Sequence, residues 1–181
     1  NACTGSGIGP TAIDEVIGVC KAYTTRVGSG PFPTELNDAT GERLQKEGDE
    51  FGATTGRPRR CGWLDLVVLR HAVQTNGLTG LAVTKLDILS GLKSLQVCTG
   101  YRWRGQTLTD MPASVDLLKD CQPVYEEMEG WKEDISAVRQ LRELPSAAQS
   151  YLSRIEKETG IPIIMVSVGA TREANILLRN P

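Results

Sequence analysis

The stretch Leu78-Thr79-Gly80-Leu81-Ala82-Val83, followed by Thr84-Lys85-Leu86-Asp87, decides how this chain is expected to fold. Residues 78–83 are apolar and favour a buried β-strand, and Asn76-Gly77 in front of them ends a preceding helix. The carboxylate of Asp87 then follows the carboxyl end of the strand. That edge is where open α/β sheets bind their ligands, so the sequence predicts a ligand site at this point.

The side chain of Asp87 suits a guanine base. Guanine presents two adjacent donors, N1–H and the 2-amino group, and one carboxylate accepts from both, whereas adenine presents no such pair. A buried Asp87 would therefore select guanine, because a mismatched base would leave polar groups unpaired. For three residues alone, a strand end with a solvated pair of Lys85 and Asp87 is the simpler interpretation.

Helix and strand patterns alternate on both sides of this stretch. Pro145 and Ser146 open a helix that Gly160 ends, and residues 161–166 are the most β-branched run of the chain, which predicts a second buried strand. That strand leads into Ser167, Val168 and Gly169, which could line the same pocket as Asp87. The alternation predicts an α/β fold.

The remaining segments give weaker predictions. Residues 23–27 favour a strand, residues 95–109 a hairpin with its turn near Arg104-Gly105, and the polar residues 36–50 a solvent-exposed surface. The acidic stretch around Glu126, Glu127 and Glu129 reads as a solvated face. Two helices are expected from apolar spacing, one with Ile13, Val16, Ile17 and Cys20 on one face, and one over residues 63–74 that buries Leu64, Val67, Val68, His71 and Ala72.

Three arginines lie within four residues at Arg57, Arg59 and Arg60, and Gly56 and Pro58 deny this segment a helix. Two unit charges ~6 Å apart in water repel by about 0.7 kcal/mol. The segment is therefore predicted to be a mobile loop whose arginines converge on a ligand with several negative charges, since the guanidinium fork matches carboxylate and phosphate oxygens. A solvated basic turn is the alternative interpretation.

Composition narrows the class of protein. The 181 residues carry 20 Lys and Arg against 22 Asp and Glu, a net charge of −2, which argues against a nucleic-acid partner. No apolar run approaches the ~20 residues that span a bilayer, so no membrane partner is expected.

The five cysteines form no CxxC pair and predict neither a disulfide framework nor a zinc site, which favours a reducing, cytoplasmic location. The single histidine, His71, is predicted to be a surface or packed residue.

Residues 21–28, 30–36, 52–60 together with 62–65, and 84–87 resemble the C-terminal part of the adenylosuccinate synthetase family. The resemblance covers essentially the whole chain as one unit, residues 1–181. The resemblance implies a P-loop-NTPase-like α/β fold: a central, mostly parallel sheet with flanking helices and a small antiparallel hairpin. It also implies a homodimer. The family is a GTP-dependent ligase of purine biosynthesis, in which GTP phosphorylates O6 of IMP and the amine of L-aspartate then displaces the phosphate, with Mg²⁺ as the metal.

The resemblance also implies roles for individual residues. Arg57 matches an arginine that touches IMP, Arg59 matches one that reaches between aspartate and GTP, and Val27 and Gly28 are expected to lie against the IMP base. The loop that closes on aspartate corresponds to Ala53, Thr54, Thr55, Gly56, Arg57, Pro58 and Arg59. The GTP-binding residues correspond to Arg59, Lys85, Leu86, Asp87, Ser167, Val168 and Gly169.

Two departures limit what the resemblance implies. Position 170 is Ala where the family usually has Pro. The family's phosphate loop, Mg²⁺ ligand, catalytic Asp base and His acid lie in an N-terminal half that does not correspond to these residues, so this chain alone is expected to hold no catalytic residue and to be inactive. The alternative functions are a guanine-nucleotide-binding module without chemistry and, disfavoured by the net charge, an RNA or phosphate contact through the arginines.

Overall fold

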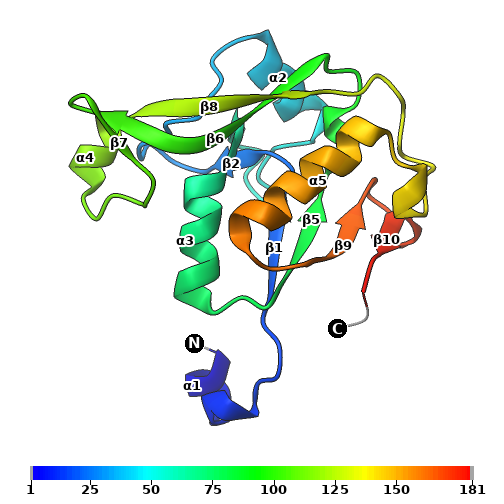
Figure 1. The fold of residues 1–181 in the computed structure, drawn as a ribbon, viewed down its shortest axis with the longest axis horizontal. Helices are drawn as coiled ribbons and strands as arrows, with labels where there is room; N and C mark the ends of the chain where they lie inside the picture. The colour runs from blue at the N-terminus through cyan, green and yellow to red at the C-terminus, as the bar shows by residue number, and fades with distance from the viewer. Residues whose placement is uncertain (1, 180–181) are drawn as a thin grey trace.

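The computed structural model describes residues 2–179. Its central sheet has the strand order β1-β5-β9-β10 (Figure 1), in which β1 (Ile17–Lys21), β5 (Gly80–Thr84) and β9 (Ile163–Ser167) are parallel and β10 (Asn175–Leu177) runs antiparallel to β9. The predicted strand is β5, and Leu81, Ala82 and Val83 in it are buried between its two neighbours. Because β5 and β9 are parallel neighbours, the segments that follow them leave the sheet at the same edge.

A second sheet is built around the predicted hairpin. The long strand β6 (Ser94–Trp103) pairs with β7 (Gln106–Leu108) across the turn at Arg104 and Gly105, with β4 (Leu64–Asp65) and with β8 (Gln122–Glu129). Two further short strands, β2 (Thr24–Arg26) and β3 (Arg60–Gly62), form an antiparallel pair. The hairpin is thus confirmed, and it belongs to a larger, mixed sheet, in which β4 runs parallel to β6 whereas β7 and β8 run antiparallel to it.

The helices are short segments between the strands. α3 (Leu66–Asn76) and α5 (Ser146–Thr159) pack against one another, and α2 (Ala39–Glu47) contacts β3 and the 3₁₀ turn η2 (Leu86–Leu89). The shorter elements are α1 (Ala2–Ser6), η1 (Pro10–Ala12), α4 (Val115–Lys119), η3 (Leu141–Glu143) and η4 (Arg172–Ala174). In Figure 1, α1 extends away from the two sheets. The α5 prediction is confirmed, with Ala148, Tyr151, Leu152 and Ile155 buried and Gly160 as the left-handed C-cap.

The helix expected around Ile13, Val16, Ile17 and Cys20 is wrong. Residues Ile17–Lys21 form strand β1, which pairs in register with β5 from Ile17 opposite Gly80 to Lys21 opposite Thr84. The helical spacing of four apolar residues is overridden by strand pairing, which suits the β-branched residues of this segment. Among the described residues β1 has only β5 as a strand partner, and Val19 remains 74% exposed.

Two other expectations need correction, and a third gains its secondary structure. Residues 36–50 are not merely surface: Asp38 accepts hydrogen bonds from Thr40 N and Gly41 N to start α2, and Leu44 is buried. The acidic stretch around Glu126 forms strand β8, paired along its length with β6, and the expected solvated face is confirmed in that Glu127 and Glu129 are exposed. α3 starts only after the cap at Asp65, so its buried residues are Leu66, Val67 and Leu69, whereas Val68 and His71 are exposed.

Candidate functional site

The segments after β5 and β9 meet at one edge of the central sheet. η2 follows β5 directly and lies against β9. Lys85, between β5 and η2, has a φ of +61°, in the left-handed region that non-glycine residues rarely occupy. Such a conformation persists where surrounding contacts hold it, and it is enriched at functional sites. The turn brings Asp87 to the edge of the sheet, as the sequence predicted.

Asp87 carries an unsatisfied acceptor. Its Oδ1 is buried, and no hydrogen-bond donor within residues 2–179 reaches it. Burial raises the pKa of the Asp87 carboxyl, which Lys85 partly counteracts and the nearby carboxylate of Asp134 reinforces. A buried acceptor without a donor costs about 1–3 kcal/mol, so Oδ1 is suited to a donor that a ligand would supply.

The exit from β9 is tightly built. Ser167 Oγ donates to Gly169 O at 2.8 Å, and Val168, fully buried, donates its N–H to Ala174 O at 2.9 Å. A Cβ on Gly169 would lie 3.0 Å from the Cβ of Ala174, so a larger residue at position 169 would crowd this turn. Ala170 is exposed. The three predicted residues Ser167, Val168 and Gly169 therefore form one compact turn on the strand next to β5.

The arginine segment is a loop closed by its own backbone. Gly52 N donates to Arg57 O at 2.8 Å, and Arg59 N donates to Glu50 O at 2.8 Å. The tip, which consists of Ala53, Thr54, Thr55 and Gly56, is exposed, and Gly56 adopts a positive φ of +64°. The loop prediction is thus confirmed, with the ends of the loop held together and the tip in solvent.

A buried carboxylate lies at the base of this loop. Glu50 has no exposed surface, and its Oε2 accepts from Lys21 Nζ at 2.6 Å and from Arg59 Nη1 at 3.0 Å. Its Oε1 accepts from Lys85 Nζ at 3.0 Å and from the hydroxyl of Tyr23 at 2.7 Å. Lys85 Nζ also donates to Gly48 O. Three cations thus surround one anion and leave an excess of positive charge at this point.

The donors around Glu50 determine its ionisation. Burial alone would raise the pKa of this carboxyl, but hydrogen bonds from Lys21, Tyr23, Lys85 and Arg59 together lower it to about 2. Glu50 is therefore ionised at neutral pH. Burial and the same carboxylate raise the pKa of the Tyr23 hydroxyl, which keeps its proton and donates it.

Arg60 has a different role from the one expected. It lies in β3, not in the loop tip, and its Nε donates to Glu35 Oε1 at 2.6 Å. Its Nη1 donates to Gly28 O at 2.9 Å and Gly30 O at 2.7 Å, and its guanidinium lies over the ring of Phe32. Arg60 therefore holds the turn over residues 28–35 in place.

Two of the three guanidiniums have carboxylate partners within the chain, whereas the convergence of the arginines on an external anion stays a prediction. Glu35 pairs with Arg60 and Glu50 with Arg59, whereas no acidic side chain of the described chain pairs with Arg57. Arg57 is exposed. Val27 is also exposed and precedes Gly28, which has a φ of +84° and open space around its Cβ position.

Sequence reasoning missed Glu50, Lys21 and Tyr23. Lys21 and Tyr23 lie in residues 21–28, which carried the family resemblance but gave no sign of a buried ion pair. Glu50 ends a polar, glycine-broken stretch, and nothing in that pattern indicates that its side chain is buried. Only the fold brings these residues together, across 29 positions for Lys21 and 35 for Lys85.

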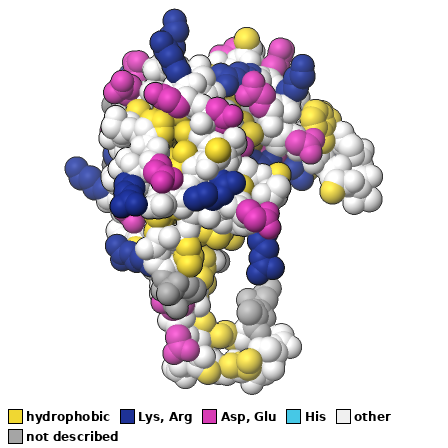
Figure 2. Space-filling view, turned by 90° about the vertical axis from the view of Figure 1, so that its right-hand side faces the viewer, with side chains coloured by type: hydrophobic (Ala, Val, Ile, Leu, Met, Phe, Trp, Pro, Cys, Tyr) yellow, Lys and Arg dark blue, Asp and Glu magenta, His cyan; other side chains and the backbone are white. Residues whose placement is uncertain are grey.

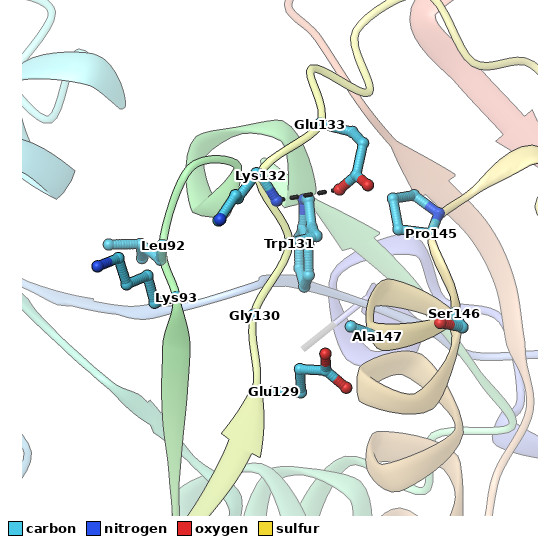
Figure 3. A pocket seen from close by; sticks show the side chains of 10 residues that line it. All are labelled: Leu92, Lys93, Glu129, Gly130, Trp131, Lys132, Glu133, Pro145, Ser146 and Ala147. Carbon is cyan, nitrogen blue, oxygen red and sulfur yellow. Dashed lines mark hydrogen bonds between the residues drawn. The ribbon is translucent and has the colours of Figure 1, made fainter.

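One surface pocket contains none of the predicted site residues (Figure 3). It has a volume of about 410 Å³ and lies between the end of β8 and the start of α5. Trp131, at its centre, is buried and donates from Nε1 to Ser90 Oγ at 3.1 Å. The other side chains around it in Figure 3 include Lys93, Glu129, Lys132 and Glu133.

The described residues offer no set of metal ligands: within 2–179, no three side chains of His, Cys, Asp or Glu are placed to hold an ion. The same part of the chain contains no helix of the length and hydrophobicity needed to cross a membrane. On the face in Figure 2, basic and acidic side chains are interspersed over the upper body.

Comparison with known proteins gives consistent matches. The sequence model of adenylosuccinate synthetase matches residues 1–176. The adenylosuccinate synthetase of Syntrophus aciditrophicus is 60% identical over 100% of this chain and 42% of its own length, and that of Pelobacter propionicus is 59% identical over 99% of the chain and 42% of its length. A structure described as fully ligated adenylosuccinate synthetase from Plasmodium falciparum superposes with a TM-score of 0.94 at 41% identity, over 98% of this chain and 43% of that one. The chain thus spans less than half the length of these relatives.

Proposed function

Because the chain belongs to the adenylosuccinate synthetase family, we propose that it supplies the aspartate loop and the guanine pocket of a GTP-dependent ligase that joins IMP to L-aspartate. In this reaction the γ-phosphoryl group of GTP activates O6 of IMP, and the aspartate amine displaces it as phosphate to give adenylosuccinate. The chain corresponds to the C-terminal part of that enzyme.

The observation that carries this proposal is the buried, unpaired Oδ1 of Asp87 at the edge of the central sheet. One carboxylate there accepts from N1–H and the 2-amino group of guanine, and the donors satisfy an acceptor that the protein leaves open. Leu86, which is buried, and Lys85 hold Asp87 in place from β5. Ser167, Val168 and Gly169 form the opposite wall.

The arginine loop supplies the second part of the site. Arg57 binds a carboxylate of aspartate and reaches IMP, and Arg59 lies between aspartate and GTP. Both are suited to this because the guanidinium fork binds two oxygens at once. The exposed tip, Ala53, Thr54, Thr55 and Gly56, together with Pro58, closes over aspartate and excludes water from the phosphorylated intermediate, which water would otherwise destroy.

The rest of the reaction belongs to residues outside those described. The catalytic Asp base and His acid, the phosphate loop and the Mg²⁺ ligands are supplied by the other part of the enzyme, where a bound Mg²⁺ would neutralise phosphate charge. Val27 and Gly28 lie against the IMP base. The whole enzyme is a homodimer in the cytoplasm, without a nucleic-acid or membrane partner.

The test is nucleotide preference in the full-length enzyme. Adenylosuccinate formation is followed with GTP, ITP and ATP for the wild type and for Asp87→Asn. We expect kcat/KM for GTP to fall by ~10–100-fold in Asp87→Asn, with the advantage of GTP over ITP and ATP largely lost, because one charge-assisted acceptor becomes an amide. Asp134→Asn is the matched control, since this exposed carboxylate lies near Asp87 and is not expected to touch the base.

Two results would refute the proposal. Failure of the wild-type full-length enzyme to form adenylosuccinate from IMP, aspartate and GTP would leave only a guanine-binding module. An unchanged nucleotide preference in Asp87→Asn would remove Asp87 from the guanine pocket.

A further inference from the structure

Glu50 joins two segments that the proposed function assigns to different ligands. Arg59 belongs to the aspartate loop and Lys85 to the guanine segment, and the two lie 26 positions apart in the sequence. Both donate to the same buried carboxylate, Arg59 to Oε2 at 3.0 Å and Lys85 to Oε1 at 3.0 Å. Because the two oxygens are fixed to one carbon, the position of one cation constrains the position of the other.

The remaining donors hold the carboxylate itself. Tyr23, buried beside it, donates to Oε1 at 2.7 Å, and Lys21 donates to Oε2 at 2.6 Å. Lys21 is held in turn by Thr25 Oγ1 at 2.9 Å. Glu50 therefore has donors on both oxygens from the β1–β2 region as well as from the two ligand segments, and it has little freedom to rotate.

Stability alone is a weak reason for this arrangement. Burying charged groups costs desolvation energy, and buried ion pairs are often no more stabilising than apolar residues of the same size. Here three cations compete for one anion, and Lys85 also adopts an unusual left-handed backbone conformation. An excess of positive charge held in fixed positions is the arrangement that anionic ligands require.

We propose that Glu50 is a positioning residue that couples the two binding sites: it holds Arg59 of the aspartate loop and Lys85 of the guanine segment in a fixed relation, so that filling one site prepares the other. This inference rests on the proposed function and adds to it a residue that touches no substrate. Coupling of this kind is reciprocal: aspartate binding tightens the nucleotide site as much as the nucleotide tightens the aspartate site.

The test is Glu50→Gln in the full-length enzyme. The glutamine side chain has the size of the glutamate side chain but no charge, and its NH2 group would point a donor towards the cations of Lys21, Arg59 or Lys85. We expect KM for aspartate and KM for GTP each to rise about tenfold, the loss of one charge-assisted interaction, while KM for IMP stays within about twofold. The factor by which aspartate tightens binding of a nonhydrolysable GTP analogue, measured by calorimetry with IMP present, is expected to fall towards one.

Glu35→Gln is the matched control. Glu35 pairs with the neighbouring Arg60 by a similar two-point contact, but neither residue contacts the guanine segment in the described structure. We expect this variant to leave KM for GTP and the coupling factor within about twofold of the wild type. General destabilisation of the aspartate loop would instead change both quantities in Glu35→Gln as well as in Glu50→Gln.

Tyr23→Phe keeps the test valid if Glu50→Gln does not fold. It removes one neutral donor from Oε1 and keeps the ring in the core. We expect the same selective pattern at about two- to fivefold.

The outcomes separate the two proposals. The role of Glu50 alone is overturned if the wild type is active and Glu50→Gln keeps the aspartate–nucleotide coupling. Where Glu50→Gln does not fold, the same conclusion follows if Tyr23→Phe keeps this coupling. Equal changes in all three KM values also overturn it, because they indicate a general structural role. A wild type that forms no adenylosuccinate overturns the proposed function and this inference with it.

Discussion

The hydroxyl of Tyr101 in β6 lies 2.6 Å from Oδ2 of Asp65, the residue that caps α3, and both side chains are buried. The other oxygen of Asp65, Oδ1, accepts from Val67 N at 3.0 Å and Val68 N at 3.2 Å. The carboxylate of Asp65, the last residue of β4, thus caps the start of α3 and accepts the hydrogen bond of the buried Tyr101 hydroxyl. The second sheet and α3 are joined at this residue.

Replacing Tyr101 by Phe is expected to destabilise the protein by about 1–2 kcal/mol, because it leaves a buried carboxylate oxygen without its donor. Asp65→Ala is expected to cost more, about 2–4 kcal/mol, since it removes the helix cap and strands the Tyr101 hydroxyl. Urea denaturation followed by circular dichroism measures both. Tyr125→Phe is the control, because no hydrogen bond of the Tyr125 hydroxyl is found among the described residues. If Tyr101→Phe were as stable as Tyr125→Phe, the expectation would be contradicted.

The ionisation of Glu50 predicts how stability depends on pH. Its pKa in the folded protein is about 2 against an ordinary value of 4.5, because the hydrogen bonds from Lys21, Tyr23, Lys85 and Arg59 outweigh burial. A lowered pKa stabilises the fold fully above pH 4.5, and this contribution is lost as the pH falls from there towards 2.

The measurement compares wild type and Glu50→Gln by urea denaturation at steps from pH 6 to pH 2. We expect the wild type to be the more stable protein at pH 6 and the difference to shrink steadily below pH 4.5. Parallel stability curves for the two proteins over this range would show that the Glu50 carboxyl does not have a lowered pKa.

Gly48 is the position where the packing around Glu50 leaves no room. A Cβ there would lie 2.1 Å from the Tyr23 hydroxyl oxygen and 2.6 Å from Leu44 O. Gly48→Ala is therefore expected to cost about 1–3 kcal/mol and to displace Tyr23 from Glu50. Gly5→Ala is the control, with nothing within 4 Å of the added atom. Thermal unfolding of the two variants checks this; equal melting temperatures would contradict the crowding at Gly48.

Local signals explain what the sequence predicted correctly. The strand β5, the helix α5 with its Gly160 cap, the hairpin β6–β7 and the position of Asp87 each follow from residues that lie next to one another in the chain. Those patterns report burial and turns directly. The loop predicted around Arg57 and Arg59 followed from Gly56 and Pro58 in the same way, although Arg60 belongs to β3.

Long-range contacts explain what the sequence did not predict. The segment of Ile17 and Val19 has apolar spacing that fits a helix, and only pairing with β5 makes it a strand. Glu50 sits in a polar stretch and is buried because cations from Lys21 and Lys85 converge on it. Likewise, the positive charge of Arg59 and Arg60 is met by Glu50 and Glu35 from elsewhere in the chain, a fact that no spacing of arginines reveals.

The two arginines of the loop are expected to differ in what their loss does. Arg57 is exposed and pairs with no acidic side chain in residues 2–179, whereas Arg59 pairs with the buried Glu50. Arg57→Leu in the full-length enzyme should therefore leave stability unchanged and raise KM for aspartate by ~10–100-fold in the presence of saturating IMP, with KM for GTP within about twofold. Arg59→Leu should raise both KM values and lower stability, because it leaves Glu50 with one donor fewer.

Steady-state kinetics with aspartate and GTP varied in turn, together with thermal unfolding, distinguish the two variants. Arg102→Leu, at an exposed position of β6 outside the loop, controls for the loss of one surface charge and should change neither KM. If Arg57→Leu left KM for aspartate equal to that of Arg102→Leu, the unpaired guanidinium at the loop would not be a carboxylate-binding group. If Arg59→Leu raised KM for aspartate and left KM for GTP unchanged, the contact between Arg59 and Glu50 would not influence nucleotide binding. The guanine segment would then hold Lys85 in place without the aspartate loop.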